Sequence, residues 1–526
     1  MANFEDLIEE LGGLGKFQVF LTFCIISCQF FIGWSMLQMS YSGLIPDYRC
    51  LIGDDVDNTT QRYLNNNLNV CEVNGTSCTS YHFYGSSKTV ISEWDIVCDL
   101  KWAKPTITSV QMGGVLLGAI LAGQMSDTLG RKNSLYSFVT FHIVLNVVAA
   151  FSVSWIMFAV LRFFIGVGIG AVVVIVFNYP IEFLPIKWRP VLSIIPSWTL
   201  GVALFSAAAL VLDNWSHLHL ACAILSTPSL LGFFFVPESI RWLAVQGRLK
   251  EANAVVEKIA RFNGTEIPVN TAKILQEVVD TERKSRETAQ NYIYLDLFRS
   301  LNMAKNNVVL WFFWFSLSSS FYGISFGVAS LSGNLYLNIF LLAIMELPVQ
   351  FSTFFLNNKF GRKRSSLAFF TLAALPCLGC LLAQLLASDD VRGPAVNGLS
   401  LTAKMMVGAA WSCAQIWTSE LYPTVVRNLG FGFGNVGARV GGIVAPFIIN
   451  LDDMPVVAYA VMTGLLFSCS VLTLVLAETK GSTLSDSLAT DTEGGKKQNH
   501  HEKGEMDMGN RVGGGGGEGE KTKLEN

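Results

Sequence analysis

The sequence predicts an all-α membrane protein with twelve transmembrane helices in two pseudo-symmetric bundles of six. Three observations support this prediction. Hydrophobic residues make up 51% of the chain and charged residues 15%, whereas soluble domains carry about 25% charged residues. Twelve apolar runs have roughly the 20 residues that a helix needs to cross a bilayer. Short motifs occur twice, 231 to 240 residues apart, which indicates a duplicated domain.

The predicted elements follow one another in five segments. A cytoplasmic N-terminus at 1–16 precedes a first bundle at 17–236, and a linker at 237–305 leads to a second bundle at 306–477 and a tail at 478–526. The tail is polar and Gly-rich, so we expect it to be disordered. The expected spans lie near 17–40, 106–125, 134–153, 155–178, 190–212, 217–236, 306–328, 335–356, 366–387, 400–418, 428–450 and 456–476.

The duplicated motifs support the two-bundle arrangement. Parallel halves of this kind are one of the repeat plans of secondary transporters, whose substrate path lies between the halves. The pairs are Glu182 to Arg189 with Glu420 to Arg427, Gly130-Arg131-Lys132 with Gly361-Arg362-Lys363, and Glu238 with Glu478.

Basic residues in the short loops predict the orientation. Arg131, Arg189 and Arg362 follow the second, fourth and eighth spans, and loops rich in Lys and Arg stay in the cytoplasm. Both termini and the linker are then cytoplasmic, while the loop at 41–105 lies outside. We therefore expect a multi-pass protein of the plasma membrane.

The outside loop has two features of an oxidising compartment. Asn58 and Asn74 begin N-glycosylation signals. An even set of cysteines predicts two disulfides whose connectivity the sequence leaves open. These cysteines are Cys50, Cys71, Cys78 and Cys98.

Enzyme chemistry finds no support in the sequence. There is no phosphate-binding loop, no cluster with metal-ligand spacing and no nucleophile with a neighbouring base, so we expect no catalytic residue, no metal and no cofactor. The net charge of −3 and the pI of about 6.1 argue against a nucleic-acid partner. The lipid bilayer is the partner that the composition predicts.

A motif closes the second span: Gly123-Gln-Met-Ser-Asp127-Thr-Leu-Gly130-Arg131-Lys132. Gly123 permits close helix approach, and Asp127 can pair with a cation or a helix N-terminus. The motif resembles the hallmark loop of the major facilitator superfamily, with Thr128 where a basic residue is usual. The resemblance implies that its charges latch the inner gate; the alternative is a solvated loop that only sets topology. The gating set comprises Gly123, Asp127, Gly130, Arg131, Arg162, Glu182, Arg189, Glu238, Arg241, Arg362, Glu420, Arg427 and Glu478.

Four segments narrow the family. Those beginning at Phe4, Ser92, Pro237 and Ser419 resemble the organic cation, anion and zwitterion transporter family, over about residues 4–482. The resemblance implies alternating access and small organic ions as substrates, with sodium coupling, exchange and facilitated diffusion all open. The loop at 214–217 departs from the family, which usually has Trp-Arg there.

Three residues of the second bundle are the candidate substrate site. Glu346 and Arg439 are ionisable residues inside spans, which are functional candidates by default, and Tyr322 is added by the family resemblance. An arginine can clamp a carboxylate, and Glu346 can balance an amine. In the family, this combination resembles carriers of zwitterions of the carnitine, betaine or ergothioneine type. Organic anions or cations, a non-transporting sensor or scaffold, and a structural Glu346–Arg439 pair are the alternatives.

Overall fold

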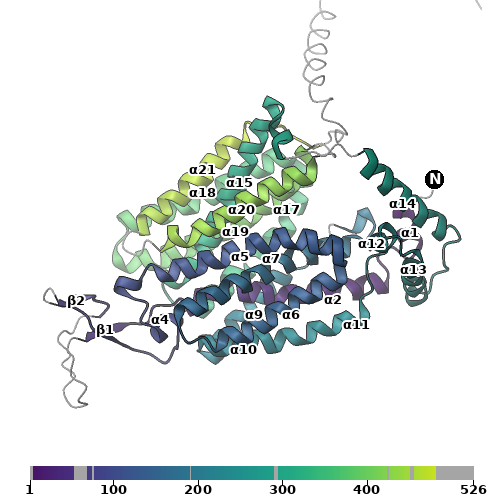
Figure 1. Cartoon of the computed structure of the whole chain (residues 1–526). Coiled ribbons are helices and arrows are strands. Elements are labelled where there is room, and N and C mark those ends of the chain that lie inside the picture. The colour runs from purple at the N-terminus through teal and green to yellow at the C-terminus, as the bar shows by residue number, and fades with distance from the viewer. Residues whose placement is uncertain are drawn as a thin grey trace, which may run out of the picture.

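The computed structural model describes residues 4–51, 68–73, 76–189, 191–288, 294–422, 426–450 and 455–480. Asn58, Asn74 and the tail beyond residue 480 lie outside these ranges, as does the side chain of Arg427. Two bundles of helices lie side by side, and short strands and a group of small helices lie at their opposite ends (Figure 1).

The first bundle follows the short helix α1 (Phe4–Glu10). Its long helices are α2 (Lys16–Leu37), α5 (Ala103–Leu129), α6 (Arg131–Ala150), α7 (Trp155–Ile181), α9 (Ser197–Leu212) and α10 (Trp215–Ser226). Shorter helical pieces extend or connect them: α3 (Met39–Ser42), α4 (Val90–Glu93), η1 (Cys98–Leu100), η2 (Ile186–Trp188), α8 (Val191–Ile194), η3 (Thr227–Leu231) and α11 (Gly232–Phe235).

Small helices link the two bundles: α12 (Ile240–Val245), α13 (Leu249–Asn263), α14 (Thr271–Thr288) and η4 (Tyr294–Phe298). We call the side of the molecule that carries α12–α14 the linker end. The second bundle consists of α15 (Leu301–Phe326), η5 (Gly327–Ser330), α16 (Leu335–Ile344), α17 (Glu346–Phe360), α18 (Arg362–Leu386), α19 (Asp389–Leu421), α20 (Arg427–Ile449) and α21 (Pro455–Thr473).

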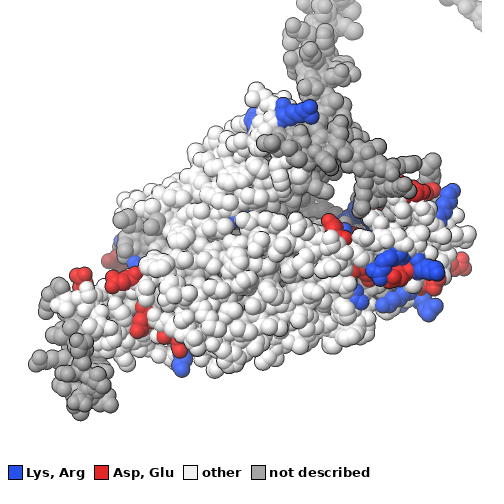
Figure 2. All heavy atoms as spheres, in the orientation of Figure 1, with Lys and Arg blue, Asp and Glu red and all other residues white. Residues whose placement is uncertain are grey.

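Apolar composition fits the helices to lipid. Nine helices in the described part of the chain are long and apolar enough to cross a membrane, and in Figure 2 the face between the two charged ends is almost free of charged side chains. The fifth, eighth and tenth expected spans are not among the nine. The helix α9 is short, the eighth span is broken between α16 and α17, and α19 contains charges such as Asp390 and Lys404.

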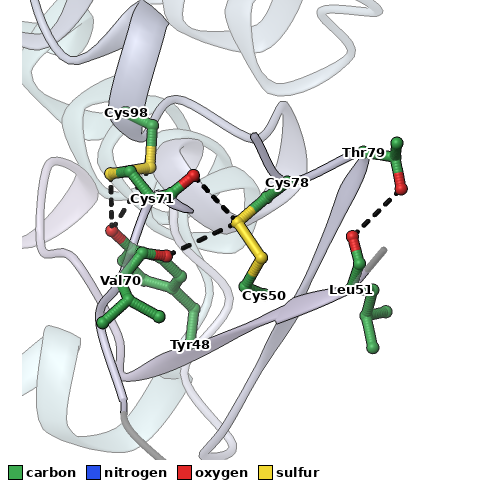
Figure 3. The surroundings of a disulfide bond; sticks show 8 residues. All are labelled: Tyr48, Cys50, Leu51, Val70, Cys71, Cys78, Thr79 and Cys98. Carbon is green, nitrogen blue, oxygen red and sulfur yellow. Dashed lines mark hydrogen bonds between the residues drawn. A yellow bond between two sulfur atoms is a disulfide. The ribbon is translucent and has the colours of Figure 1, made fainter. Parts of the chain in front are cut away.

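The other end of the molecule carries the strands, and we call it the disulfide end. β1 (Tyr48–Leu51) pairs antiparallel with β4 (Ser80–Phe83), and β2 (Glu72–Val73) pairs with β3 (Thr76–Ser77). Disulfides join Cys50 to Cys78 and Cys71 to Cys98. The Tyr48 hydroxyl lies 3.7 Å from the Cys71 sulfur and 3.6 Å from the Cys98 sulfur (Figure 3). The four cysteines thus fasten this loop against the bundle.

The bundles meet through hydrogen bonds near the disulfide end. The Ser40 hydroxyl donates to the Ser325 carbonyl at 3.0 Å, and the Ser109 hydroxyl donates to the Ile443 carbonyl at 2.7 Å. At the linker end, the charge clusters described below stay within one bundle each. The structure is therefore closed at the disulfide end.

Candidate functional site

A small cavity lies between the bundles. Its free volume is about 20 Å³, which is room for about one water molecule, so an organic ion enters only when the bundles move. Both bundles contribute to its wall, which combines apolar groups, hydroxyls and one pair of charges. The lining residues are Leu37, Ser40, Trp198, Thr199, Val202, Ser325, Val328, Ile339, Leu342, Ala343, Glu346 and Lys404.

Glu346 faces this cavity because the eighth span is interrupted. The helix α16 ends at Ile344 and α17 begins at Glu346, with Pro348 in the first turn, where a missing N–H breaks no helical hydrogen bond. A carboxylate in the first turn of a helix is favoured by the helix dipole. The break thus places an acid at a stabilised position in the middle of the membrane.

The partner of Glu346 is Lys404 on α19, at 3.1 Å between Nζ and Oε1. The two side chains are only 8% and 3% exposed, and the Lys404 ammonium also lies over the ring of Phe321. The contact brings the charges together without the alignment of a hydrogen bond, since Nζ has no hydrogen-bond acceptor among the described residues. Glu346 is therefore neutralised by a residue that our sequence analysis did not select.

Lys404 could have been selected from the sequence alone. It interrupts the apolar tenth span, and an intramembrane lysine is a functional candidate for the same reason as Glu346 and Arg439. The alternative of a structural Glu346–Arg439 pair is not what the structure shows, because Lys404 takes that place.

Arg439 has no counter-charge among the residues that the structure describes. It lies half-buried on α20, makes no ion pair with any residue the structure describes, and its Nε is buried without a hydrogen-bond partner. Tyr322 on α15 lies within electrostatic range of both Arg439 and Glu346. A guanidinium with a buried free donor is suited to bind a carboxylate.

Glycines bring Tyr322 and Arg439 together. A Cβ added at Gly437 would lie 2.7 Å from the carbonyl oxygen of Trp311, and one at Gly442 would lie 3.5 Å from the Tyr322 ring. The Ser319 hydroxyl also donates to the Gly441 carbonyl at 3.2 Å. Small residues are what permit such close helix approach, so α20 and α15 present the two side chains to one region.

The duplicated gate motifs form a charge cluster in each bundle. In the first bundle, Arg131 Nε donates to Glu182 at 3.0 Å, and Arg131 Nη1 lies 2.9 Å from Asp127. Glu238 accepts hydrogen bonds from the backbone N–H of Arg131 (2.8 Å) and Lys132 (3.2 Å) at the start of α6. We call Arg131, Glu182 and Glu238 the first triad.

The second bundle repeats this arrangement. Arg362 donates to Glu420 from Nε at 2.9 Å and from Nη2 at 2.8 Å, and Glu478 accepts from the Arg362 backbone N–H at 2.8 Å. We call Arg362, Glu420 and Glu478 the second triad. The matching contacts mean that the repeat in sequence is also a repeat in side-chain chemistry.

The pKa shifts of Glu238 and Glu478, the two carboxylates bound at the starts of α6 and α18, have opposite directions. Burial raises the pKa of Glu238 above its usual value, although hydrogen bonds from the N–H groups of Ser239, Lys132 and Arg131 act against it. Burial also acts to raise the pKa of Glu478, but hydrogen bonds from backbone N–H groups, that of Lys480 first, prevail and lower it.

Other predicted gating residues lie apart from the triads. Arg189 pairs with Glu5 of α1, and Arg241 is exposed. Arg162 is fully buried, donates to Gln111 and lies over the Phe158 ring. Its Nε and Nη1 are buried without a hydrogen-bond partner among the described residues, so Arg162 is a second buried cation, inside the first bundle and outside the cavity lining.

The prediction that Gly123 permits close helix approach is wrong for this conformation. Gly123 is exposed, and an added Cβ would meet nothing within 4 Å. The reason is that α5 meets α7 nearer its middle, where a Cβ on Gly166 or Gly170 would collide with the backbone of Gln111 or Val115. The end of α5 that bears Gly123 faces open space at the linker end.

Known proteins resemble the whole chain. The family model described as "Sugar (and other) transporter" matches residues 20–487. Solute carrier family 22 member 7 of Mus musculus is 28% identical over 94% of this chain and 98% of its own length, and that of Sus scrofa is 32% identical over 76% and 73%. Organic cation/carnitine transporter 2 of Rattus norvegicus is 28% identical over 93% and 94%.

A solved structure shares the fold. The inward open conformation of the xylose transporter XylE from E. coli matches with a TM-score of 0.65 at 15% identity, covering 89% of this chain and 98% of that one. The predicted major facilitator fold is therefore confirmed, and the relatives are transporters and not enzymes. The chain belongs to the sugar and other transporter family, and within it to the organic cation, anion and carnitine transporters of solute carrier family 22.

Proposed function

We propose that this protein is a plasma-membrane carrier that moves small carboxylated organic ions by alternating access between its two bundles. Both termini lie in the cytoplasm and the disulfide end lies outside. This orientation agrees with the basic residues near the linker end and with disulfides in an oxidising compartment. Hydrogen bonds between the bundles close the disulfide end, and Gly123 is exposed near the linker end. We therefore assign this conformation to the inward-facing part of the cycle, with a cavity still too small for a substrate.

The observation that carries the substrate proposal is that Arg439 forms no ion pair with any described residue. Its buried Nε lacks a partner among the described residues, and leaving a buried charged donor unsatisfied is costly. A substrate carboxylate removes that cost by accepting the free donors. Tyr322, beside it, offers a hydroxyl to the same group.

Charge balance ranks the substrate classes. Arg439 and Lys404 contribute two positive charges against the one of Glu346, so a monovalent organic anion neutralises the site. The zwitterion hypothesis depended on a Glu346 free to balance an amine, and Lys404 already occupies it. We therefore place organic anions first.

Zwitterions of the carnitine, betaine or ergothioneine type are the second candidate. Glu346 lines the cavity, so one carboxylate oxygen is positioned to meet an ammonium while the other stays with Lys404. One relative is named organic cation/carnitine transporter 2, and carnitine is such a zwitterion.

An uptake panel tests the proposal. Cells expressing the chain receive an aryl carboxylate, carnitine, ergothioneine and a quaternary ammonium cation, with and without external sodium, and accumulation is measured by mass spectrometry. The variant Arg439→Gln should reduce uptake of carboxylated substrates at least about tenfold, the effect of losing one charge-assisted hydrogen bond. Arg248→Gln, which alters an exposed pair with Glu251, is the matched control.

The outcomes separate the alternatives. Uptake of the aryl carboxylate alone supports the anion, whereas uptake of carnitine or ergothioneine supports the zwitterion. Uptake of the cation alone, unchanged in Arg439→Gln, contradicts the role of Arg439. No uptake from a surface-localised protein favours a non-transporting sensor or scaffold.

A further inference from the structure

Asp213 lies where the sequence departs from its family, directly before the loop at 214–217. It ends α9 with a left-handed backbone, φ +43°, which costs less for Asp or Asn than for other side chains. The geometry turns its half-buried carboxylate toward the junction of the two bundles at the disulfide end.

Four hydroxyls donate to this carboxylate. Those of Ser87 (2.6 Å), Tyr41 (2.8 Å) and Tyr336 (2.9 Å) share Oδ1, and that of Ser86 (2.9 Å) binds Oδ2. Burial acts to raise the pKa of Asp213, but these hydrogen bonds outweigh it and lower the pKa. The group is thus a carboxylate anion at neutral pH.

Three of the four donors lie in the same half of the molecule as Asp213. Tyr41 belongs to α3 of the first bundle, and Ser86 and Ser87 belong to the disulfide-bearing loop. That loop is attached to the same place through its backbone, because the Lys88 N–H donates to the Asp213 carbonyl at 3.1 Å and the Trp215 N–H donates to the Lys88 carbonyl at 3.0 Å. Asp213 is therefore fixed to the first bundle.

The fourth donor comes from the other bundle. Tyr336 is the second residue of α16, and its ring lies 6.2 Å from that of Tyr41. Its backbone carbonyl also accepts a hydrogen bond from Ser206 on α9. Tyr336 therefore makes two contacts with α9 and the residue that ends it: its backbone carbonyl accepts from Ser206, and its hydroxyl donates to the Asp213 carboxylate.

We infer that Asp213 and Tyr336 form a latch that holds the disulfide end closed, a gating role beyond the transport function proposed above. Opening this end carries Tyr336 away with the second bundle, while Asp213 keeps the donors of its own bundle. A hydrogen bond to an ionised acceptor is stronger than one between neutral groups. Its loss on opening therefore favours the closed state.

Cysteine accessibility tests the latch. Val328 lines the cavity near this end and is 1% exposed, so a Val328→Cys reporter reacts with a membrane-impermeant thiol reagent on intact cells only when the end opens. In this background Tyr336→Phe should raise the labelling rate about tenfold, since it removes the donor that crosses the bundles. Asp213→Asn should raise it as well, because the acceptor loses its charge.

Tyr41→Phe is the matched control. It removes the same chemical group from the same carboxylate oxygen, but within one bundle, so labelling should stay near that of the parent. Protein lacking the reporter gives the background of the native thiols, Asp390→Cys at the exposed start of α19 reports that this end faces outside, and surface biotinylation normalises each rate. Equal increases for the two tyrosine variants, or no increase for Tyr336→Phe and Asp213→Asn, overturn the latch.

Discussion

The linker ends of the two bundles are built alike, whereas their interiors are not. Each end has an arginine bound to a glutamate and a second glutamate that accepts backbone N–H groups at a helix start. Inside the second bundle lie three charges, Glu346, Lys404 and Arg439. Among the described residues of the first bundle, the fully buried charge is Arg162, which donates to the neutral Gln111.

This difference shows which features the two halves share and which they do not. The triads fix how the helices of a bundle meet, a task that both halves share. The interiors differ at the cavity: the first bundle supplies hydroxyls and rings such as Ser40, Thr199 and Trp198, and the second supplies the charges of Glu346 and Lys404. Four experiments can break or sharpen this comparison.

The largest effect should come from unpairing the interior of the second bundle. Lys404→Met leaves Glu346 buried without its counter-charge, and removing one partner of a buried pair costs about 3–5 kcal/mol. We expect little protein at the cell surface. Adding Glu346→Gln removes both charges and should restore it, as measured by surface biotinylation and by thermal unfolding of purified protein. Full stability of Lys404→Met alone would mean that Glu346 is protonated in the folded protein.

A smaller and unequal effect should follow from the triad arginines. Arg131→Gln leaves Glu182, whose Oε2 already lacks a hydrogen-bond partner among the described residues, without its donor. In Arg362→Gln, Glu420 keeps the Thr479 hydroxyl at 2.6 Å. We expect the free energy of unfolding to fall by about 2–3 kcal/mol in the first case and about 1–2 kcal/mol in the second, in chemical denaturation of purified protein.

The exposed Arg248→Gln supplies the baseline for these variants, because an ion pair at the surface contributes little to the free energy of unfolding. Equal losses for Arg131→Gln and Arg362→Gln would show that the two ends are alike in energy as well as in geometry.

The sequence predicted the fold well, and for a physical reason. Lipid demands apolar runs of one length and confines basic residues to one side, and both patterns are local properties of the chain. The triads could be anticipated because each residue occurs twice at nearly the same offset. None of this needed knowledge of which helices touch.

What the sequence left open depends on packing between distant segments. The Glu346–Lys404 pair joins α17 to α19, and Asp213 collects donors from α3, the loop at 86–87 and α16. No periodicity reports such contacts. The prediction for Gly123 failed for a related reason: α5 packs against α7 nearer its middle, at Gly166 and Gly170, and the sequence of α5 alone does not report where the two helices meet.

The pH dependence of stability should distinguish the two triads further. The raised pKa of Glu238 means that the folded state binds its proton more tightly than the unfolded state does, so its contribution to stability grows as pH falls toward the unfolded pKa and is lost as pH rises through the folded one. The lowered pKa of Glu478 has the opposite effect: its contribution is present at neutral pH and disappears as pH falls through the folded pKa.

Melting temperatures of Glu238→Gln and Glu478→Gln, taken from about pH 7 to pH 4, measure this difference. As the pH falls, the melting temperature of Glu238→Gln should decrease relative to that of the wild type, and the melting temperature of Glu478→Gln should increase relative to it. Parallel curves would contradict the assigned pKa directions.

The smallest effect concerns Asp127, an acid beside the first triad for which the second bundle has no acidic counterpart at the matching position. Asp127 pairs with Arg131 from a side chain that is 71% exposed, and Asn358 occupies the corresponding position four residues before Arg362. Since an exposed pair is screened by water, Asp127→Asn should lower the free energy of unfolding by less than about 1 kcal/mol, and Asn358→Asp should raise it by no more. In the conformation described here, neither substitution changes a contact between the bundles. If Asp127→Asn nevertheless alters transport strongly while its melting temperature stays the same, Asp127 acts in the outward-facing state, where the resemblance to the superfamily loop places its gating role. Measuring both the stability and the transport rate of Asp127→Asn therefore distinguishes two roles. A residue that stabilises its bundle changes the first, whereas a residue that acts only in the other conformation changes the second.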